Sequence, residues 1–345
     1  MSKNQYRIAV VGATTLLGKE VGDEIAESPL ATATTLLLDT EDSSGTLEAI
    51  GDEATFIQPL EPAALENLDV AIFTDAKMFA EHGRTARQMG AAVVDATGTG
   101  EPGREALVRS PLAAEVFADS APLNLETIAV TVAHPIATML ALVLGKSLTA
   151  GALTSVAATV LQPASENGRA ALDELQQQTV NLLSFQSVPR EEFDAQVAFN
   201  LLPSLGEAAK APIDLTEARI RRHLRVLAGN RLPDPLLQII QAPVFHGFAV
   251  SLFIEFAQPV ALQTLLTSFK SESIDLVGEE GDPPSNLSSA GQAQILLQVK
   301  SADADAETST RFALWMTADN LKLAARTAVA CALELTRMRP LGIVQ

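Results

Sequence analysis

Residues 7–18 read RIAVVGATTLLG, and this stretch decides the fold of the first part of the chain. The run 7–11 is rich in β-branched residues and ends at Gly12, a pattern that predicts a buried strand of a parallel sheet. Helical spacing follows in residues 17–26. A glycine loop between a strand and a helix can hold a pyrophosphate, because the helix N-terminus presents free backbone N–H groups. The stretch therefore predicts the start of a nucleotide-binding α/β domain.

Strands and helices continue to alternate after this loop. The pattern predicts strands at 33–38, 70–73 and 92–95, and a helix at 79–89 that closes at Gly90. Alternation of this kind requires crossover connections and a parallel sheet. We therefore expect a doubly wound, Rossmann-like domain in the first third of the chain.

The middle of the chain has a different pattern. Apolar strands are expected at 155–161, 237–241 and 248–256, and helices at 168–183, 215–227 and 319–338. Long gaps between the strands favour an α+β domain with a mixed or antiparallel sheet and helices on one face. We expect the Rossmann-like domain to comprise residues 1–133 and 322–345, and the α+β domain to comprise residues 134–321.

Length and charge limit the classes of function. A chain of 345 residues is long enough for two cores. Its formal net charge of -18 repels phosphate backbones, which argues against nucleic acid and anionic membrane surfaces as partners. Cys331 is the single cysteine, so no disulfide can form within the chain. There is no signal-peptide pattern and no apolar run of the ~18 residues that a membrane helix needs, so we expect a cytoplasmic protein.

The glycine loop has the spacing G-x-x-x-x-x-G and lacks a central glycine. Thr15 stands where phosphates approach the backbone most easily when no side chain is present. The residues that would line a cofactor are Gly12, Thr14, Thr15, Leu16 and Leu17. The alternative is a tight strand-to-helix turn that binds nothing.

Asp39 at the end of the second strand has two interpretations. An acidic side chain there can bond a ribose 2′-hydroxyl, which favours NAD over NADP. The alternative is a cap of a helix or turn. Glu41 and Asp42 add negative charge that disfavours a 2′-phosphate, so NAD is the expected cofactor if either dinucleotide binds.

Several further segments match one family in the same order. They are IAVVGATTLLG at 8–18, LDVAIFT at 68–74, VVDAT at 93–97, AFNLLP at 198–203, PVFHG at 243–247 and DNL at 319–321. The chain resembles the aspartate-semialdehyde dehydrogenase family over nearly its whole length. The resemblance implies a homodimer, each subunit having a nucleotide-binding domain and a catalytic, dimerising domain. In active members a cysteine thiolate attacks the aldehyde, a histidine acts as acid and base, hydride passes to NADP, and phosphate releases the acyl group.

The catalytic positions of that family are changed here. Aligned on Thr138, Ile136 takes the place of the cysteine, and a shift by one residue would put Pro135 there; neither can be a nucleophile. Phe248 takes the place of the histidine and Gln241 that of the arginine that holds the substrate carboxylate. One family residue is retained, Gln162, although it is also explained as an ordinary strand residue that forms hydrogen bonds.

Other positions differ as well. Arg222 stands at about the place of a substrate-binding glutamate, and Glu101 near that of the phosphate-site arginine, for which Arg104 could substitute only in a shifted loop. The segment that reads the 2′-phosphate in the family becomes TEDSSG at 40–45, its A-G-G becomes DAK at 75–77, and an asparagine of the last helix becomes Ala328. Cys331 is expected to be a small buried apolar residue.

Two histidines could support other chemistry. His134 and His246 could each act as a general base or a metal ligand, but no H-x-x-H, C-x-x-C or carboxylate cluster accompanies them. We expect both to be structural and expect no metal site.

Two functions remain open. The first is an inactive paralogue, similar to the Usg-like proteins of this family, that binds a small-molecule ligand or serves in assembly. The second is a nicotinamide-linked oxidoreductase that acts on an aldehyde or semialdehyde of amino-acid biosynthesis without a covalent intermediate. In both we expect a homodimer whose partner covers the second face of the mixed sheet. The alternative is a monomer in which residues 262–298 fold over that face.

Overall fold

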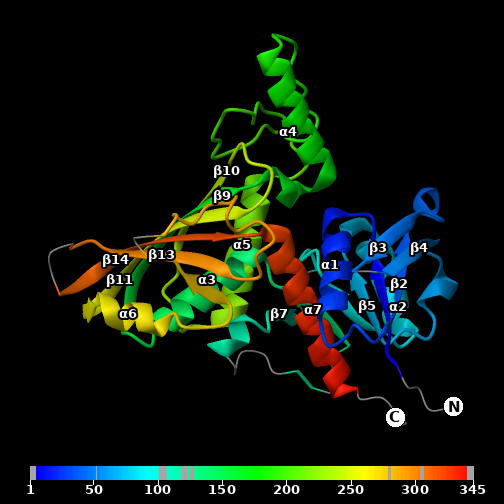
Figure 1. Ribbon diagram of the computed structural model, residues 1–345, viewed down its shortest axis with the longest axis horizontal. Helices are drawn as coiled ribbons and strands as arrows, with labels where there is room; N and C mark the ends of the chain where they lie inside the picture. The colour runs from blue at the N-terminus through cyan, green and yellow to red at the C-terminus, as the bar shows by residue number, and fades with distance from the viewer. Residues whose placement is uncertain are drawn as a thin grey trace. The chain divides into compact units, whose positions relative to one another are not determined.

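The computed structural model describes residues 5–51, 53–100, 107–117, 123–124, 128–278, 281–303 and 307–339 (Figure 1). The chain divides into two compact units, one formed by Met1–His134 with Ala324–Gln345 and the other by Pro135–Leu323. The predicted fold class, an α/β unit followed by a unit with a mixed sheet, is confirmed. Among the described helices, none has both the length and the apolar character needed to cross a membrane.

The first unit is built on an eight-stranded sheet with the order β3-β4-β2-β1-β5-β6-β8-β7. Its strands are β1 (Arg7–Val11), β2 (Thr34–Asp39), β3 (Leu47–Ile50), β4 (Glu53–Pro59), β5 (Val70–Phe73), β6 (Ala92–Asp95), β7 (Leu107–Arg109) and β8 (Ala129–Val132). The described strand pairs are parallel except β3 with β4. Since β2 and β5 flank β1, the loops that follow these three strands meet at one edge of the sheet.

Helices cover both faces of this sheet. α1 (Leu16–Glu27) shares a core cluster with Ile8 and Val10 of β1 and with the last helix, α7 (Asn320–Met338), from Ala325 onward. α2 (Ala76–Gln88) packs on the other face, in a cluster that contains Ala9 and Val11. Successive side chains of a strand point to opposite faces, and helices cover both faces of this sheet. The β1 residues that point to either face are therefore buried. This explains why the strand reads as a continuous apolar run.

The second unit contains a six-stranded sheet with the order β10-β9-β11-β14-β13-β12. Its strands are β9 (Leu153–Gln162), β10 (Leu236–Gln241), β11 (Phe248–Ala261), β12 (Ile274–Leu276), β13 (Ile295–Ser301) and β14 (Thr308–Ala318). The pairs β9–β10 and β12–β13 are parallel and the others antiparallel, so the expected mixed sheet is confirmed.

One face of this sheet is covered by helices and the other is not. α3 (Pro135–Ser147), α5 (Ile213–Ala228) and α6 (Leu262–Ser268) lie on the same side of the strands in Figure 1. The strand register groups the residues that point to the opposite side and are half-buried or exposed: Ser155, Ala157, Thr159, Leu161, Leu236, Gln238, Ile240, Ser251, Phe253, Glu255, Gln298, Lys300, Arg311, Ala313 and Trp315. We call this set the open face. Phe253 at its centre is 55% exposed.

An arm, residues 168–212, leaves the second unit between β9 and α5. It consists of α4 (Gly168–Leu183) and a returning segment, 184–212. In Figure 1, α4 projects from the β9–β10 side of the unit, away from α3, α5 and α6. The returning segment rejoins the unit where Leu202 forms an isolated antiparallel bridge with Gln241, the last residue of β10.

Candidate functional site

The glycine loop after β1 is closed by its own side chains. Gly12 has φ 88°, and a Cβ on it would lie 2.9 Å from both Thr74 Oγ1 and Asp75 Cβ, so only glycine fits here. The Thr15 hydroxyl accepts a hydrogen bond from the Gly18 backbone N–H at 2.9 Å and donates one to the Gly12 carbonyl at 2.8 Å. Thr15 therefore acts as the N-cap of α1. The loop still leads into the N-terminus of α1, but its central position is occupied by the Thr15 side chain.

Asp39 lies where the sequence places it, at the end of β2, and it is 3% exposed. One carboxylate oxygen accepts hydrogen bonds from the Thr14 backbone N–H at 2.7 Å and the Thr14 hydroxyl at 2.8 Å. The other accepts from the Thr40 backbone N–H at 2.7 Å. This geometry matches the capping interpretation, since both oxygens serve the loop itself. A ribose contact by Asp39 stays a prediction.

Acidic residues follow the strands on both sides of β1. Asp75, after β5, caps α2 by accepting from the Met78 backbone N–H at 2.9 Å, which is why α2 begins three residues before the predicted start. Glu41 and Asp42, after β2, are exposed in a 3-10 turn. The nearby cation Lys19 is paired with Glu48 at 2.9 Å. These residues do not fit the 2′-phosphate of NADP, because charge of the wrong sign gathers at this edge.

Ile136, which the family resemblance aligns with the catalytic cysteine, lies at the start of α3. Ile136 is fully buried, and the helix is buried on all sides from Ile136 through Gly145. Phe248, which the resemblance aligns with the family's histidine, is likewise fully buried as the first residue of β11. An alkyl and a phenyl group can neither attack a carbonyl nor transfer a proton.

Gln241 and Gln162 lie together at the carboxyl ends of β10 and β9. The register of the parallel pair sets them side by side, and both are buried. The side-chain amide of Gln241 donates to the backbone carbonyl of Gln162 at 3.1 Å. The side-chain amide of Gln162 donates to Gln241 Oε1 at 3.2 Å. Gln241, which the resemblance aligns with the family's substrate-binding arginine, is thus an uncharged amide bonded to its neighbour.

Asn320, which the sequence analysis did not single out, organises the adjacent turn. Its Oδ1 accepts from the Gly247 backbone N–H at 2.9 Å and from the Ser165 hydroxyl at 3.1 Å. Asn320 Nδ2 and Gln162 Oε1 are buried, and neither atom has a hydrogen-bond partner among the described residues. The D-N-L motif at 319–321 was the signal for Asn320, although a motif does not reveal the contacts of its side chain.

The remaining predicted positions are the two histidines and the residues Glu101 and Arg104. His134 is buried, whereas His246 is exposed, and its backbone carbonyl accepts from Asn286 at 3.3 Å. Glu101 and Arg104 lie outside the described residues. Within the described part of the chain, no group of three or more His, Cys, Asp or Glu residues could hold a metal ion.

Cys331 is a buried residue of α7 in the first unit. It is 1% exposed, and its thiol lies 3.9 Å from the Arg109 carbonyl oxygen. The Arg109 guanidinium forms a bidentate pair with Glu334, with distances of 2.5 Å and 2.8 Å. Burial raises the pKa of the Cys331 thiol far above its ordinary value, and the Glu334 carboxylate raises it further, although Arg109 opposes the shift. The thiol is therefore not a nucleophile at neutral pH.

We expect Cys331 to react with a disulfide reagent at least about a thousandfold more slowly in native protein than in guanidinium-unfolded protein at pH 8. A buried thiol reacts only after the chain opens, and opening a native core costs about 5 kcal/mol or more. Because the pKa is raised in the folded chain, ionisation of the Cys331 thiol favours unfolding. The contribution of the protonated thiol to the free energy of unfolding is therefore present below pH 9.0 and is lost as the pH rises above that value. Absorbance of the released thiolate measures the rates, and stoichiometric labelling of native protein within minutes would contradict the expectation.

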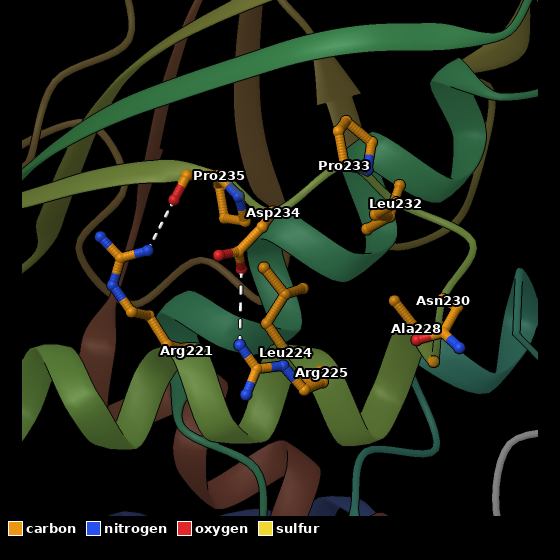
Figure 2. Close-up of a pocket in the computed structure, with 10 residues that line it drawn as sticks. Arg221, Leu224, Arg225, Ala228, Asn230, Leu232, Pro233, Asp234 and Pro235 are labelled. Atoms are coloured by element: carbon orange, nitrogen blue, oxygen red, sulfur yellow. Dashed lines mark hydrogen bonds and ion pairs between the residues drawn. The ribbon is translucent and has the colours of Figure 1, made fainter.

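A pocket of about 290 Å³ lies at the other end of β10 from Gln241 (Figure 2). It is enclosed by the C-terminal end of α5 and the segment that leads into β10. Arg221 is held by hydrogen bonds to the Pro235 and Leu237 carbonyls, and Arg225 forms an ion pair with Asp234 at 3.7 Å. The pocket contains none of the predicted site residues.

The fold defines a protein of two α/β units, one with a mainly parallel sheet and one with a mixed sheet. The family model described as "Semialdehyde dehydrogenase, dimerisation domain" matches residues 146–323, and the chain belongs to this family. The match includes β9, the arm and the open face.

Relatives support the assignment over the length of the chain. A USG-1 protein homolog of Pseudomonas aeruginosa is 28% identical over 91% of this chain and 93% of its own. An aspartate-semialdehyde dehydrogenase of Rickettsia bellii is 25% identical over 96% and 98%. A solved structure of a probable aspartate-semialdehyde dehydrogenase from Pseudomonas aeruginosa is 26% identical over 98% of this chain and 100% of its own, with a TM-score of 0.84. Aspartate semialdehyde dehydrogenase II from Vibrio cholerae shares the fold, with a TM-score of 0.82 at 21% identity over 97% and 99%.

Proposed function

We propose that this chain is a catalytically inactive member of the semialdehyde dehydrogenase family that acts by binding a ligand or by assembly. The observation that carries the proposal is the burial of Ile136, an alkyl side chain that the family resemblance aligns with the nucleophile. Cys331 cannot replace the nucleophile, because it is buried and its pKa is raised. Phe248 and Gln241 remove the acid/base group and the carboxylate clamp as well. A direct assay of semialdehyde oxidation tests the proposal.

Two unpaired amide atoms support the ligand-binding role. Gln162 Oε1 requires a hydrogen-bond donor and Asn320 Nδ2 requires an acceptor, and both are buried. A buried polar group without a partner costs about 1–3 kcal/mol, so a molecule that satisfied either would gain affinity. The ligand of this proposal is therefore a small polar molecule that carries a hydrogen-bond donor for Gln162 Oε1 or an acceptor for Asn320 Nδ2.

The open face supports a homodimer. Phe253 and Leu236 are 55% and 74% exposed, and the other residues of the face are uncharged except Glu255, Lys300 and Arg311. In the monomer alternative, residues 262–298 would cover this face. Instead α6 lies on the helical side, and the loop from residue 281 reaches the open face where the Pro284 carbonyl accepts from Trp315 Nε1 at 2.8 Å. A second copy that covers the remainder would bury an area in the range of obligate dimers, above ~2,000 Å².

The alternative function is an oxidoreductase with altered chemistry, and the glycine loop is the observation that favours it. β1, the closed turn at Gly12 and α1 keep the arrangement that binds dinucleotides elsewhere. Leu16 and Leu17 form the first turn of α1, where backbone N–H groups lack helical partners. The acidic residues at this edge favour NAD over NADP in this alternative.

Calorimetric titration at low salt should show weak or absent NADP binding, with NAD favoured if either nucleotide binds. Asp42→Arg places a cation in the acidic turn at 41–43, so it should raise the affinity for NADP relative to the affinity for NAD. Glu81→Arg, on α2, changes the net charge equally and serves as the control. Wild-type binding of NADP tenfold tighter than NAD, about 1.4 kcal/mol, would show that the acidic turn points away from the nucleotide.

A further inference from the structure

The pocket between α5 and β10 combines charged groups of both signs with apolar walls. Arg221 and Arg225 project from α5 toward the segment that leads into β10, and Asp234 points back toward Arg225 (Figure 2). The apolar walls are formed by Leu224, Ala228, Leu232, Pro233 and Pro235. The pocket lies at the opposite end of β10 from Gln241, so it is separate from the positions that the family resemblance aligns with catalysis. A concave site with apolar walls and a few polar groups is typical of small-molecule binding.

The part of α5 that lines this pocket concentrates positive charge in an acidic protein. Residues 219–231 contain five arginines and no aspartate or glutamate, although the chain has a net charge of -18. A local excess of positive charge raises the concentration of anions near the surface. The ligand is therefore expected to carry an anionic group, and a carboxylate matches the planar fork of a guanidinium.

The ion pair of Arg225 with Asp234 is loose. The charged atoms are 3.7 Å apart, and the two side chains are 69% and 74% exposed. An exposed ion pair of this kind contributes little to stability, so separating its members costs little free energy. A molecule that carries both a carboxylate and an ammonium group gives each side chain a new partner of opposite charge. The pair therefore favours a zwitterion over a simple anion.

The frame around this pair is fixed before a ligand binds. The Arg221 guanidinium donates to the Pro235 carbonyl at 2.6 Å and to the Leu237 carbonyl at 3.2 Å, so it ties α5 to the start of β10. In the sequence LPDP at 232–235, both residues that precede a proline are restricted toward extended conformations. Asp234 is therefore presented by a segment with few alternative conformations. A preformed site loses little conformational entropy when a ligand binds.

The end of α5 and the size of the pocket limit the ligand further. α5 ends at Ala228 with Gly229 as its C-cap, and the partial negative charge of a helix C-terminus attracts a cation such as an ammonium group. The pocket has a volume of about 290 Å³. A cavity of about 150 Å³ holds benzene. The pocket therefore has room for a side chain such as that of leucine or phenylalanine beside the two charged groups.

We propose that this pocket binds an α-amino acid with an apolar side chain, of about the size of leucine or phenylalanine. Arg225 binds the carboxylate, Asp234 binds the ammonium group, and the apolar walls cover the side chain of the ligand. The site is independent of the unpaired amide atoms of Gln162 and Asn320, so it stands whether or not those atoms bind a ligand.

Calorimetric titration of the full chain with L-leucine and L-phenylalanine tests the proposal. At least one of the two should bind with a single molecule per chain and should raise the Tm as its concentration rises. Isocaproate, which is leucine without its amino group, and isopentylamine, which is leucine without its carboxylate, should each bind at least about tenfold more weakly than leucine, because each loses a charge-assisted hydrogen bond. Equal affinity for isocaproate and leucine would overturn the assignment of an amino acid.

Two substitutions locate the binding site. Arg225→Gln and Asp234→Asn should each raise the Kd of the bound amino acid at least about tenfold, because each removes one charge that the ligand contacts. The matched control is Arg169→Gln with Asp173→Asn, an exposed arginine–aspartate pair of α4 with a distance of 3.0 Å. The control should leave the Kd within about twofold of wild type.

Two results would overturn the proposal. The first is that neither amino acid gives binding heat or a rise in Tm at millimolar concentrations. The second is that an amino acid binds with a Kd that Arg225→Gln and Asp234→Asn both leave unchanged, since the ligand would then occupy another part of the protein.

Discussion

Purified protein mixed with aspartate semialdehyde, phosphate and NADP should form no NADPH above a control without enzyme. The same result is expected with NAD. Loss of the nucleophile and its base lowers turnover on the order of 10⁶-fold in enzymes of covalent mechanism. Ile136 and Phe248 present only hydrocarbon at these two positions, and Gln241 is bonded to Gln162. Absorbance of the reduced nicotinamide over hours measures the rate.

Single restorations should fail as well. Ile136→Cys supplies a thiol, but without a histidine at Phe248 the thiol has no base, and without an arginine at Gln241 the substrate carboxylate has no clamp. Groups that act as a unit are strongly non-additive, so the single variant should remain at background. An active family member prepared in parallel shows that the substrate is competent. Turnover by wild-type protein that disappears when Gln162 or Gln241 is replaced would contradict the proposed inactivity.

Gly18→Ala should destabilise the first unit by about 3 kcal/mol or more and lower its Tm by roughly 6–12 °C. A Cβ at Gly18 would lie 2.3 Å from the Gly12 carbonyl oxygen and 2.9 Å from Ala13 Cα. Both are backbone atoms of the closed loop, so they cannot move without breaking the turn that holds α1 against β1. Thermal unfolding followed by circular dichroism measures the shift.

Gly22 provides the matched control in the same helix. A Cβ there would lie 3.6 Å from Ile50 Cγ1, an ordinary contact. Gly22→Ala should therefore stabilise the protein by up to about 1 kcal/mol, because alanine loses less backbone entropy in a helix than glycine. Equal destabilisation by the two substitutions would show that helix packing, and not the loop, limits the residues allowed in α1.

The sequence predicted best those elements whose local pattern agrees with their burial. β5 and β6 were placed without error because both of their faces are buried, which makes the run continuously apolar. α4 was also placed to the residue, since its spacing and its flanking residues suffice without tertiary contacts. The antiparallel pair β3–β4 was missed, because β3 alternates exposed with half-buried residues and resembles a surface loop.

The sequence predicts which residues stand at the family's catalytic positions, but it does not predict their arrangement. The family resemblance aligns Ile136, Phe248 and Gln241 with the catalytic cysteine, histidine and arginine, and this alignment stays a prediction. The mutual bonding of Gln241 and Gln162 could not be foreseen, since it depends on the register of two strands far apart in the chain. The capping role of Asp39 was left open for the same reason, because its partners come from another loop.

The return of the last helix to the first unit has a consequence for how the protein is made. Ala325, Val329 and Leu335 belong to the same core cluster as Ile8 and Val10, so one face of the first sheet lacks part of its apolar cover until α7 has left the ribosome. The second unit, Pro135–Leu323, is contiguous in sequence and can close its core earlier. The second unit can therefore complete its core before the first unit does, although translation begins with the first unit. The nascent first unit must avoid aggregation while the rest of the chain is added.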